Sequence, residues 1–118
     1  LLFHADSACR IADIWRSYFS QPLFWAADLR VGFMGQYVEQ VRNVHDYMGD
    51  LLAEADLYYK AEALVNLLSS WSSHHTTMQG MMEALWADMY MRGYIELFDV
   101  ELVQLWLQEL TAAGLSFP

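Results

Sequence analysis

The sequence predicts a mainly α-helical chain with a small α/β remnant in its first half. Over most of the 118 residues, apolar side chains recur every three or four positions, which is the period of an amphipathic helix. Residues 29–34 instead alternate apolar and other side chains, which is typical of a short strand. We therefore expect two parts. Residues 1–56 hold a helix, the strand and a polar loop, and residues 57–118 form an acidic subdomain of three antiparallel helices.

The first helix is expected from about Ile11 to Ala27. Pro22 lacks a backbone donor and disfavours helical backbone at the residue before it, so we expect a kink there or a break into two helices. Asp13 and Arg16 are three residues apart and share one face, where they mark a polar edge on an otherwise apolar helix. This edge is either an ion pair on a solvated surface or a place for chemistry, and the residues alone leave both interpretations open.

A second polar cluster lies within residues 36–56, which show no clear period. Five polar side chains occur within six consecutive residues, and they are Arg42, Asn43, His45, Asp46 and Tyr47. Loops carry functional groups more often than the framework that they connect, so this cluster is the second candidate site. A solvated connection without a function is the alternative.

Three further helices are expected in the second half of the chain. Their apolar stripes start at Leu57, Met78 and Val100, and the helices should end in the polar run 69–75, at Gly93 and at Gly114. Asp99 is expected to be the N-cap of the third helix. His74 and His75 make a weak metal site, because adjacent helical side chains point in different directions and no third ligand is suitably spaced.

Composition limits the partners of the chain. Residues 46–118 hold eleven acidic residues against Lys60 and Arg92, which accounts for the whole net charge of −9. An acidic surface repels phosphates, so we expect neither nucleic acid nor an anionic membrane on that face. Hydrophobic residues make up 56% of the sequence, more than a domain of this size usually buries. We expect another domain or chain to cover part of this surface, and the sequence to be a piece of a longer protein.

Several familiar chemical signatures are missing from the sequence. Cys9 is the single cysteine, so an internal disulfide is excluded. There is no glycine-rich phosphate loop, no His-Glu-x-x-His and no Asp-x-Asp pair. No apolar run is long enough to span a bilayer. The residues alone therefore support a helical piece with two candidate polar sites and no complete catalytic set.

Four ordered blocks resemble a known family, the glycosyltransferase-like proteins that include the plant STELLO proteins. The first block, residues 11–21, contains Asp-Ile-Trp-Arg. The others are residues 40–47 with Arg-Asn-x-His-x-Tyr, residues 64–71 ending in Ser-Trp, and residues 106–118. The resemblance implies the C-terminal part of a GT-A-like glycosyltransferase fold, followed by the antiparallel three-helix subdomain. The nucleotide-binding half would then lie outside this sequence.

The resemblance also implies roles for particular residues. In such folds a divalent metal, Mn²⁺ or Mg²⁺, neutralises the diphosphate of the sugar nucleotide, and an acidic residue beside the acceptor acts as base. Asp13 would be that acidic residue and would act as the base. Arg16 would orient Asp13 or bind a phosphate. The substrate-binding residues would be Arg42, Asn43 and Tyr47, and His45 would contact the metal or the diphosphate.

Two functions follow from this resemblance as expectations. In the first, the full-length protein transfers a sugar from a nucleotide-sugar donor. This part would supply the acceptor side of the site, and the identity of the acceptor is open. The isolated chain would then bind no metal alone and would be inactive, and the family places the protein in the Golgi membrane. In the second, the fold is a non-catalytic scaffold whose acidic helices engage a partner protein.

Overall fold

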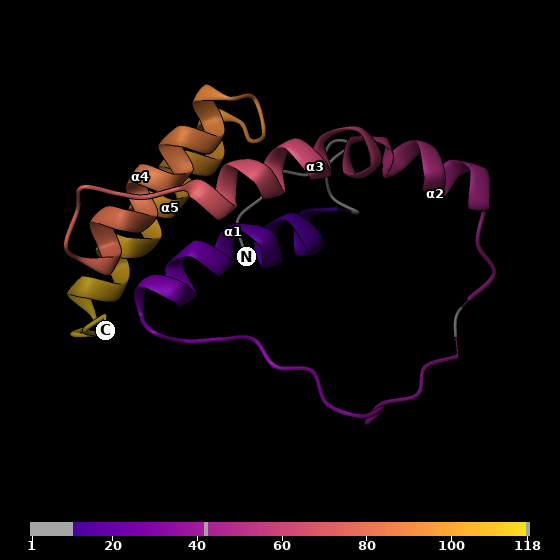
Figure 1. Cartoon of the computed structure of the whole chain (residues 1–118), viewed down its shortest axis with the longest axis horizontal. Helices are drawn as coiled ribbons and strands as arrows, with labels where there is room; N and C mark the ends of the chain where they lie inside the picture. The colour runs from indigo at the N-terminus through magenta and orange to yellow at the C-terminus, as the bar shows by residue number, and fades with distance from the viewer. Residues whose placement is uncertain (1–10, 42, 118) are drawn as a thin grey trace.

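Five helices make up the regular structure in a computed structural model that describes residues 11–41 and 43–117. They are α1 (Ala12–Ala26), α2 (Tyr47–Ala53), α3 (Ala55–Ser70), α4 (Met78–Met91) and α5 (Leu97–Ala112), shown in Figure 1. The radius of gyration is 16.0 Å. A compact domain of this length would have a radius of gyration of roughly 13–14 Å. The mainly α-helical expectation is confirmed, and parts of the chain extend away from the packed core.

Helix α1 presents one straight stripe of apolar side chains to the core. Ile11, at its N-terminal boundary, and Trp15, Phe19 and Leu23 are buried and follow one another at four-residue spacing, one above the other along the helix. Pro22 lies inside this helix, which continues to Ala26, so the expected break into two helices is wrong. We attribute the continuity to packing. Phe19 and Leu23, on either side of the proline, are buried in the same core and offset the missing backbone bond.

The three later helices form close to the expected positions. Leu64 and Leu68 are the buried residues of α3, and α4 and α5 bury a larger set, which is Leu85, Trp86, Met89, Asp99, Val100, Val103 and Leu107. The cap predicted at Gly93 is confirmed, because this residue adopts a positive φ of 72° directly after the C-cap of α4.

The start of α5 corrects one prediction. Asp99 is the third residue of this helix, and Glu96 is its N-cap. The two residues form a capping box, in which the backbone N–H of Glu96 donates to Asp99 Oδ2 at 2.9 Å and the Glu96 side chain accepts from the backbone of Asp99. Asp99 is thus a capping residue in the reciprocal position, and the helix begins three residues earlier than an N-cap at Asp99 would place it.

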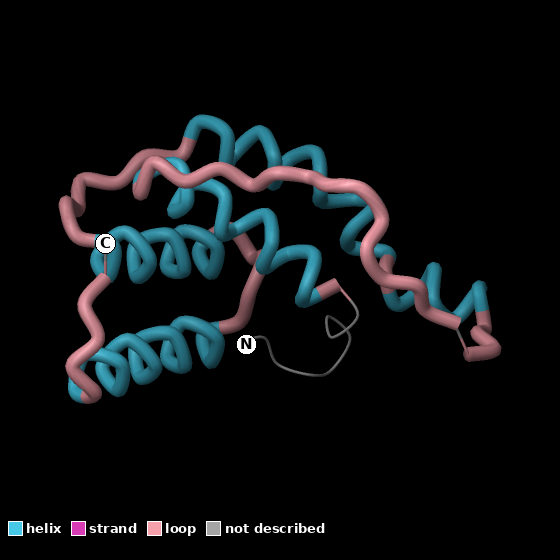
Figure 2. Tube along the Cα trace, turned by 90° about the horizontal axis from the view of Figure 1, so that it is seen from below, coloured by secondary structure: helices cyan, strands magenta, loops and turns pink. Residues whose placement is uncertain are grey.

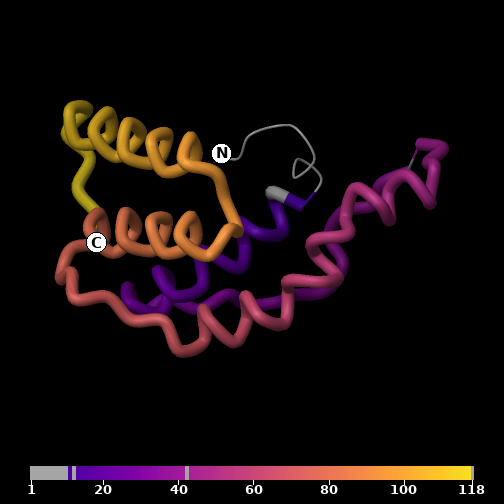
Figure 3. The backbone as a smooth tube through the Cα atoms, turned by 90° about the horizontal axis from the view of Figure 1, so that it is seen from above, coloured from indigo at the N-terminus to yellow at the C-terminus, as the bar shows by residue number. Residues whose placement is uncertain are grey.

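The helices pack as an antiparallel pair, α4 and α5, joined to α3 through α1 (Figures 2 and 3). Helix α1 contacts both α3 and α4, while α2 contacts α3. In the core, the Phe19 ring meets the Trp86 ring edge-on with a centroid distance of 5.7 Å. One hydrophobic cluster therefore contains side chains from both sides of residue 56. The division of the chain at that residue stays a prediction.

The expected strand at residues 29–34 is wrong, since the described residues contain no strand. This segment opens the long connection between α1 and α2, much of which lies apart from the helices in Figure 1. Phe33 is 99% exposed and Met34 is 83% exposed. A strand needs a neighbour to complete its backbone hydrogen bonds, and no described segment provides one.

A second correction concerns residues 36–56, because they contain α2 rather than a continuous irregular loop. Asp46 caps this short helix by accepting hydrogen bonds from the backbone N–H groups of Met48 and Gly49. Among the residues that the structure describes, none of the helices has the length and apolar character needed to cross a membrane. Cys9 lies outside the described residues.

Candidate functional site

The first candidate group lies on the solvent side of α1. Asp13 is exposed in the first turn, where its Oδ1 accepts a hydrogen bond from the backbone N–H of Ile14 at 2.9 Å. A carboxylate at this end of a helix is favoured by the helix dipole. Arg16 is also exposed and lies about one turn further along. Within the described residues no ion pair joins the two side chains, so the guanidinium of Arg16 is not neutralised by Asp13.

A shallow groove of about 280 Å³ opens beside Arg16. Its lining comes from the outer face of α1 and from the extended connection, and it consists of Arg16, Ser17, Ser20, Gln21, Phe24 and Val31. Both serine hydroxyls donate to backbone carbonyls one turn earlier, Ser17 to Asp13 at 3.0 Å and Ser20 to Arg16 at 2.7 Å. Their oxygen lone pairs remain available as acceptors. The groove thus combines one cation, hydroxyl acceptors, an amide and an aromatic ring.

Sequence reasoning missed most of this groove. Ser17, Ser20, Gln21 and Phe24 fall at three- and four-residue steps from Asp13 and Arg16, which places them on the same face of the helix. That spacing was a usable signal. The contribution of Val31 was not readable, because it depends on how the connection folds back after α1.

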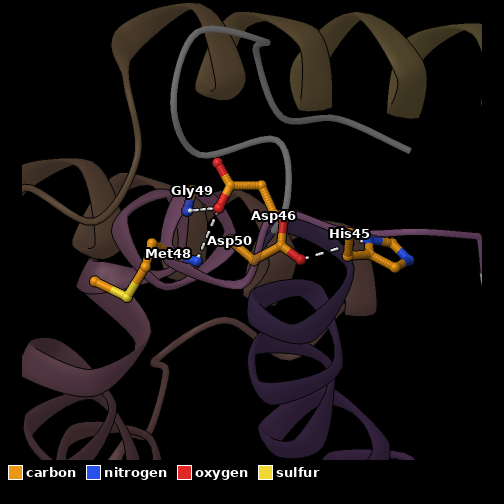
Figure 4. Close-up of polar contacts among 5 residues, drawn as sticks. All are labelled: His45, Asp46, Met48, Gly49 and Asp50. Atoms are coloured by element: carbon orange, nitrogen blue, oxygen red, sulfur yellow. Dashed lines mark hydrogen bonds and ion pairs between the residues drawn. The ribbon is translucent and has the colours of Figure 1, made fainter.

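The second candidate group surrounds the start of α2 (Figure 4). His45 Nδ1 lies 3.4 Å from Asp50 Oδ2, and both side chains are partly buried. Asp46 Oδ1 accepts from the N–H groups of Met48 at 3.1 Å and Gly49 at 3.2 Å. The sequence pointed to His45 and Asp46 as members of a polar run, but the partner Asp50 was missed. Its spacing of five residues from the histidine is not one that marks a helical pair.

The remaining predicted site residues are open to solvent or not described. Tyr47 is 81% exposed as the first residue of α2, and Asn43 is exposed in the connection. Arg42 lies outside the described residues. Helices α1 and α2 do not contact each other, because α2 packs on α3. Among the described residues, the Asp13 group and the His45 group are therefore two separate clusters.

Comparison with protein families gives these clusters a context. A family model described as STELLO glycosyltransferases matches residues 10–118. The chain belongs to the STELLO glycosyltransferase family. The match extends over all five helices and over both candidate groups of this STELLO-family chain. No curated protein and no solved structure matches it.

The described residues do not by themselves fit a metal centre. Mg²⁺ prefers six oxygen ligands in octahedral geometry, and Mn²⁺ likewise favours carboxylate, carbonyl and water oxygens. His45 and Asp50 would supply one nitrogen and one carboxylate, and the described part of this STELLO-family chain contains no group of three His, Cys, Asp or Glu side chains suited to a metal ion. The described residues therefore supply an incomplete ligand set for either ion.

Proposed function

We propose that this STELLO-family chain supplies the acceptor side of a sugar transfer from a nucleotide-sugar donor. The donor-binding half would lie in another part of the full-length protein. The family match over residues 10–118 carries the proposal, since members are described as glycosyltransferases. The groove beside Arg16 adds support, because its cation, acceptors and ring are groups that suit a polar, ring-shaped ligand such as a sugar.

In this proposal Asp13 is the general base. A general base must come within hydrogen-bond reach of the acceptor hydroxyl that it deprotonates, and the Asp13 carboxylate is exposed. Within the described residues, its one hydrogen bond engages Oδ1, which leaves Oδ2 to accept the proton. Arg16 would hold an acidic group of the acceptor or donor, because its exposed guanidinium has no ion-pair partner among the described residues.

The His45 group at the start of α2 would bind the nucleotide-sugar donor. Arg42, Asn43 and Tyr47 would bind the substrate, and His45 would contact the diphosphate or a metal whose other ligands come from elsewhere in the full-length protein. Exposure of Asn43 and Tyr47 is compatible with this role. A Mn²⁺ or Mg²⁺ ion in the full-length protein would neutralise the diphosphate of the donor.

The decisive experiment uses the full-length protein with a nucleotide-sugar donor. Asp13→Asn should lower kcat by about 10²- to 10⁴-fold, the usual contribution of general base catalysis. Asp56→Asn is the matched control, since Asp56 is also an exposed acid in the first turn of a helix and its change should alter kcat by less than about twofold. Undiminished transfer by Asp13→Asn, with an unchanged circular dichroism spectrum, would remove Asp13 from the mechanism.

A second candidate is a non-catalytic scaffold on a glycosyltransferase-like fold. The observation in its favour is α2, which contains no buried residue and exposes Met48 and Leu52. The two candidates differ in the upstream sequence and in activity. A full-length protein without an Asp-x-Asp motif, and without transfer or donor hydrolysis in the presence of Mn²⁺ or Mg²⁺, would favour the scaffold.

A further inference from the structure

Helix α2 and the first half of α3 form an arm that extends away from the rest of the helices (Figures 1 and 3). Glu54 is at once the C-cap of α2 and the N-cap of α3. The backbone keeps a helical hydrogen-bond pattern through this joint, because Glu54 N–H donates to the carbonyl of Asp50 at 3.0 Å and Leu57 N–H donates to that of Glu54 at 2.9 Å. The side-chain period of the two helices therefore continues nearly unbroken along the arm.

One side of the arm is apolar and exposed. We call it the arm face. It consists of Met48, Leu51, Leu52, Tyr58 and Tyr59 on the arm and continues to Val65 in the second half of α3, each of them exposed. Leu51, Tyr58 and Val65 are seven residues apart, as are Leu52 and Tyr59, which is the heptad spacing of a helix that packs along another helix. Leu52 is 74% exposed and Tyr59 is 84% exposed.

The arm face is not the surface by which α3 joins the core. Leu64 and Leu68 are the buried residues of α3, and this helix packs against α1. At 100° per residue these two positions lie on the side of the helix opposite Tyr59. Helix α3 thus has two apolar sides. The side of Leu64 and Leu68 packs in the core, and the opposite side belongs to the arm face, which is exposed to solvent along about five turns counted from α2. Such an exposed apolar stripe is typical of a surface that binds a partner.

The charges beside the arm face select the kind of partner. Glu54 and Glu62 lie along it without an ion-pair partner among the described residues. The nearby Lys60 is already paired, with its Nζ 2.8 Å from Asp56 Oδ2. A second copy of the chain would bring further acids against these glutamates, and an anionic lipid surface would be repelled by them. A partner that carries lysine or arginine would instead be attracted.

We propose that the arm face binds one amphipathic helix of a partner protein, apolar along its buried side and basic along its edges. The heptad spacing indicates a helical partner, and the unpaired glutamates indicate its charge. The leucine and tyrosine side chains provide the buried contact area, while Glu54 and Glu62 fix the register through rim ion pairs. Binding of this helix does not depend on sugar transfer, because the arm face includes none of the residues assigned to that reaction.

The test measures binding of synthetic helical peptides to the full chain by fluorescence anisotropy. The first peptide has about three heptads with leucine on one side and lysine on the other positions, and the second has glutamate at every lysine position. The arm-face variants are Leu52→Ser and Tyr59→Ser. The control variants are Met91→Ser and Leu105→Ser, which change exposed apolar residues on α4 and α5 that are 78% and 54% exposed. A further variant, E54Q with E62Q, removes the two flanking charges.

We expect the lysine peptide to bind at least about tenfold more tightly than the glutamate peptide. Each arm-face variant should weaken binding by about tenfold and each control by less than about twofold. The charge variant should weaken binding and reduce its salt dependence. The proposal is overturned by absent binding, by equal binding of both peptides, or by equal losses in the control variants.

Two more outcomes would also overturn the proposal by naming a different occupant. Self-association of the chain in sedimentation equilibrium that Leu52→Ser abolishes would assign the arm face to a second copy. Binding to vesicles of phosphatidylcholine and phosphatidylserine that the same variant abolishes would assign it to a membrane. Circular dichroism should show unchanged helix content in all variants, since every substituted apolar side chain is exposed.

Discussion

The substitution Phe19→Ala tests whether α1 shares one core with the helices after residue 56. Phe19 is completely buried, with its ring 5.7 Å from that of Trp86 on α4 and 6.3 Å from that of Trp15. Truncating a buried phenylalanine costs about 3–5 kcal/mol of unfolding free energy, including the cavity that it leaves. Loss of the edge-on aromatic pair is part of this cost, at about 0.5–1.5 kcal/mol. A domain with a stability of about 5–15 kcal/mol would lose a large share of it.

The assay is urea unfolding followed by circular dichroism, with Phe33→Ala as the control. Phe33 is 99% exposed, so its truncation should change the unfolding free energy by less than about 0.5 kcal/mol. The Phe19 variant should unfold in a single transition at lower urea, because side chains from α1, α3, α4 and α5 belong to one cluster. A loss below about 1 kcal/mol, or a second transition in which the helices of residues 57–118 unfold separately, would refute the shared core.

Three further predictions concern individual polar groups. The Trp71 indole N–H donates to Asp88 Oδ2 at 2.8 Å, so a double-mutant cycle of Trp71→Phe and Asp88→Ala in urea unfolding should give a coupling of about 1.5–3 kcal/mol, whereas additive losses would contradict the bond. Asp28 adopts a positive φ of 56° after α1, so Asp28→Gly should raise the unfolding free energy by about 0.5–1 kcal/mol and Asp28→Val should lower it, as thermal melts would show. Asp46→Ala should cost α2 about 1 kcal/mol of local stability, visible as faster amide exchange at Met48 and Gly49 with unchanged global stability.

The sequence predicted helices wherever an apolar stripe meets a partner within the chain. The apolar stripes of α1, α3, α4 and α5 contribute buried residues to one hydrophobic cluster. The side chains that the period placed on one face are therefore the ones that the fold buries. The ends of the helices were harder to predict. Asp99 resembled an N-cap because aspartate favours that position, but the same residue also serves at the third helical position of a capping box. Composition alone does not separate these two roles.

The candidate site was readable only in part, for the same kind of reason. Asp13 and Arg16 could be placed on one exposed helical face from their spacing, and the structure agrees. The groove beside them depends on Val31, which approaches α1 because Asp28 turns the chain through a positive φ and the N–H of Leu29 donates to the carbonyl of Phe24 at 2.7 Å. A non-glycine residue in that conformation carries little sequence signal. The pairing of His45 with Asp50 likewise required the cap at Asp46 to be known first.

The failed strand and the arm face have one physical cause. Residues 29–34 alternate apolar and other side chains as a strand would, and the arm face has apolar residues at heptad spacing. In both places no described segment buries these apolar residues. A period in a sequence states which side chains share a face, and it does not state what covers that face. The two patterns lie within residues 29–65, where Phe33, Leu52 and Tyr59 are all largely exposed. Partner binding should therefore depend on the exposed apolar residues of this stretch far more than unfolding does.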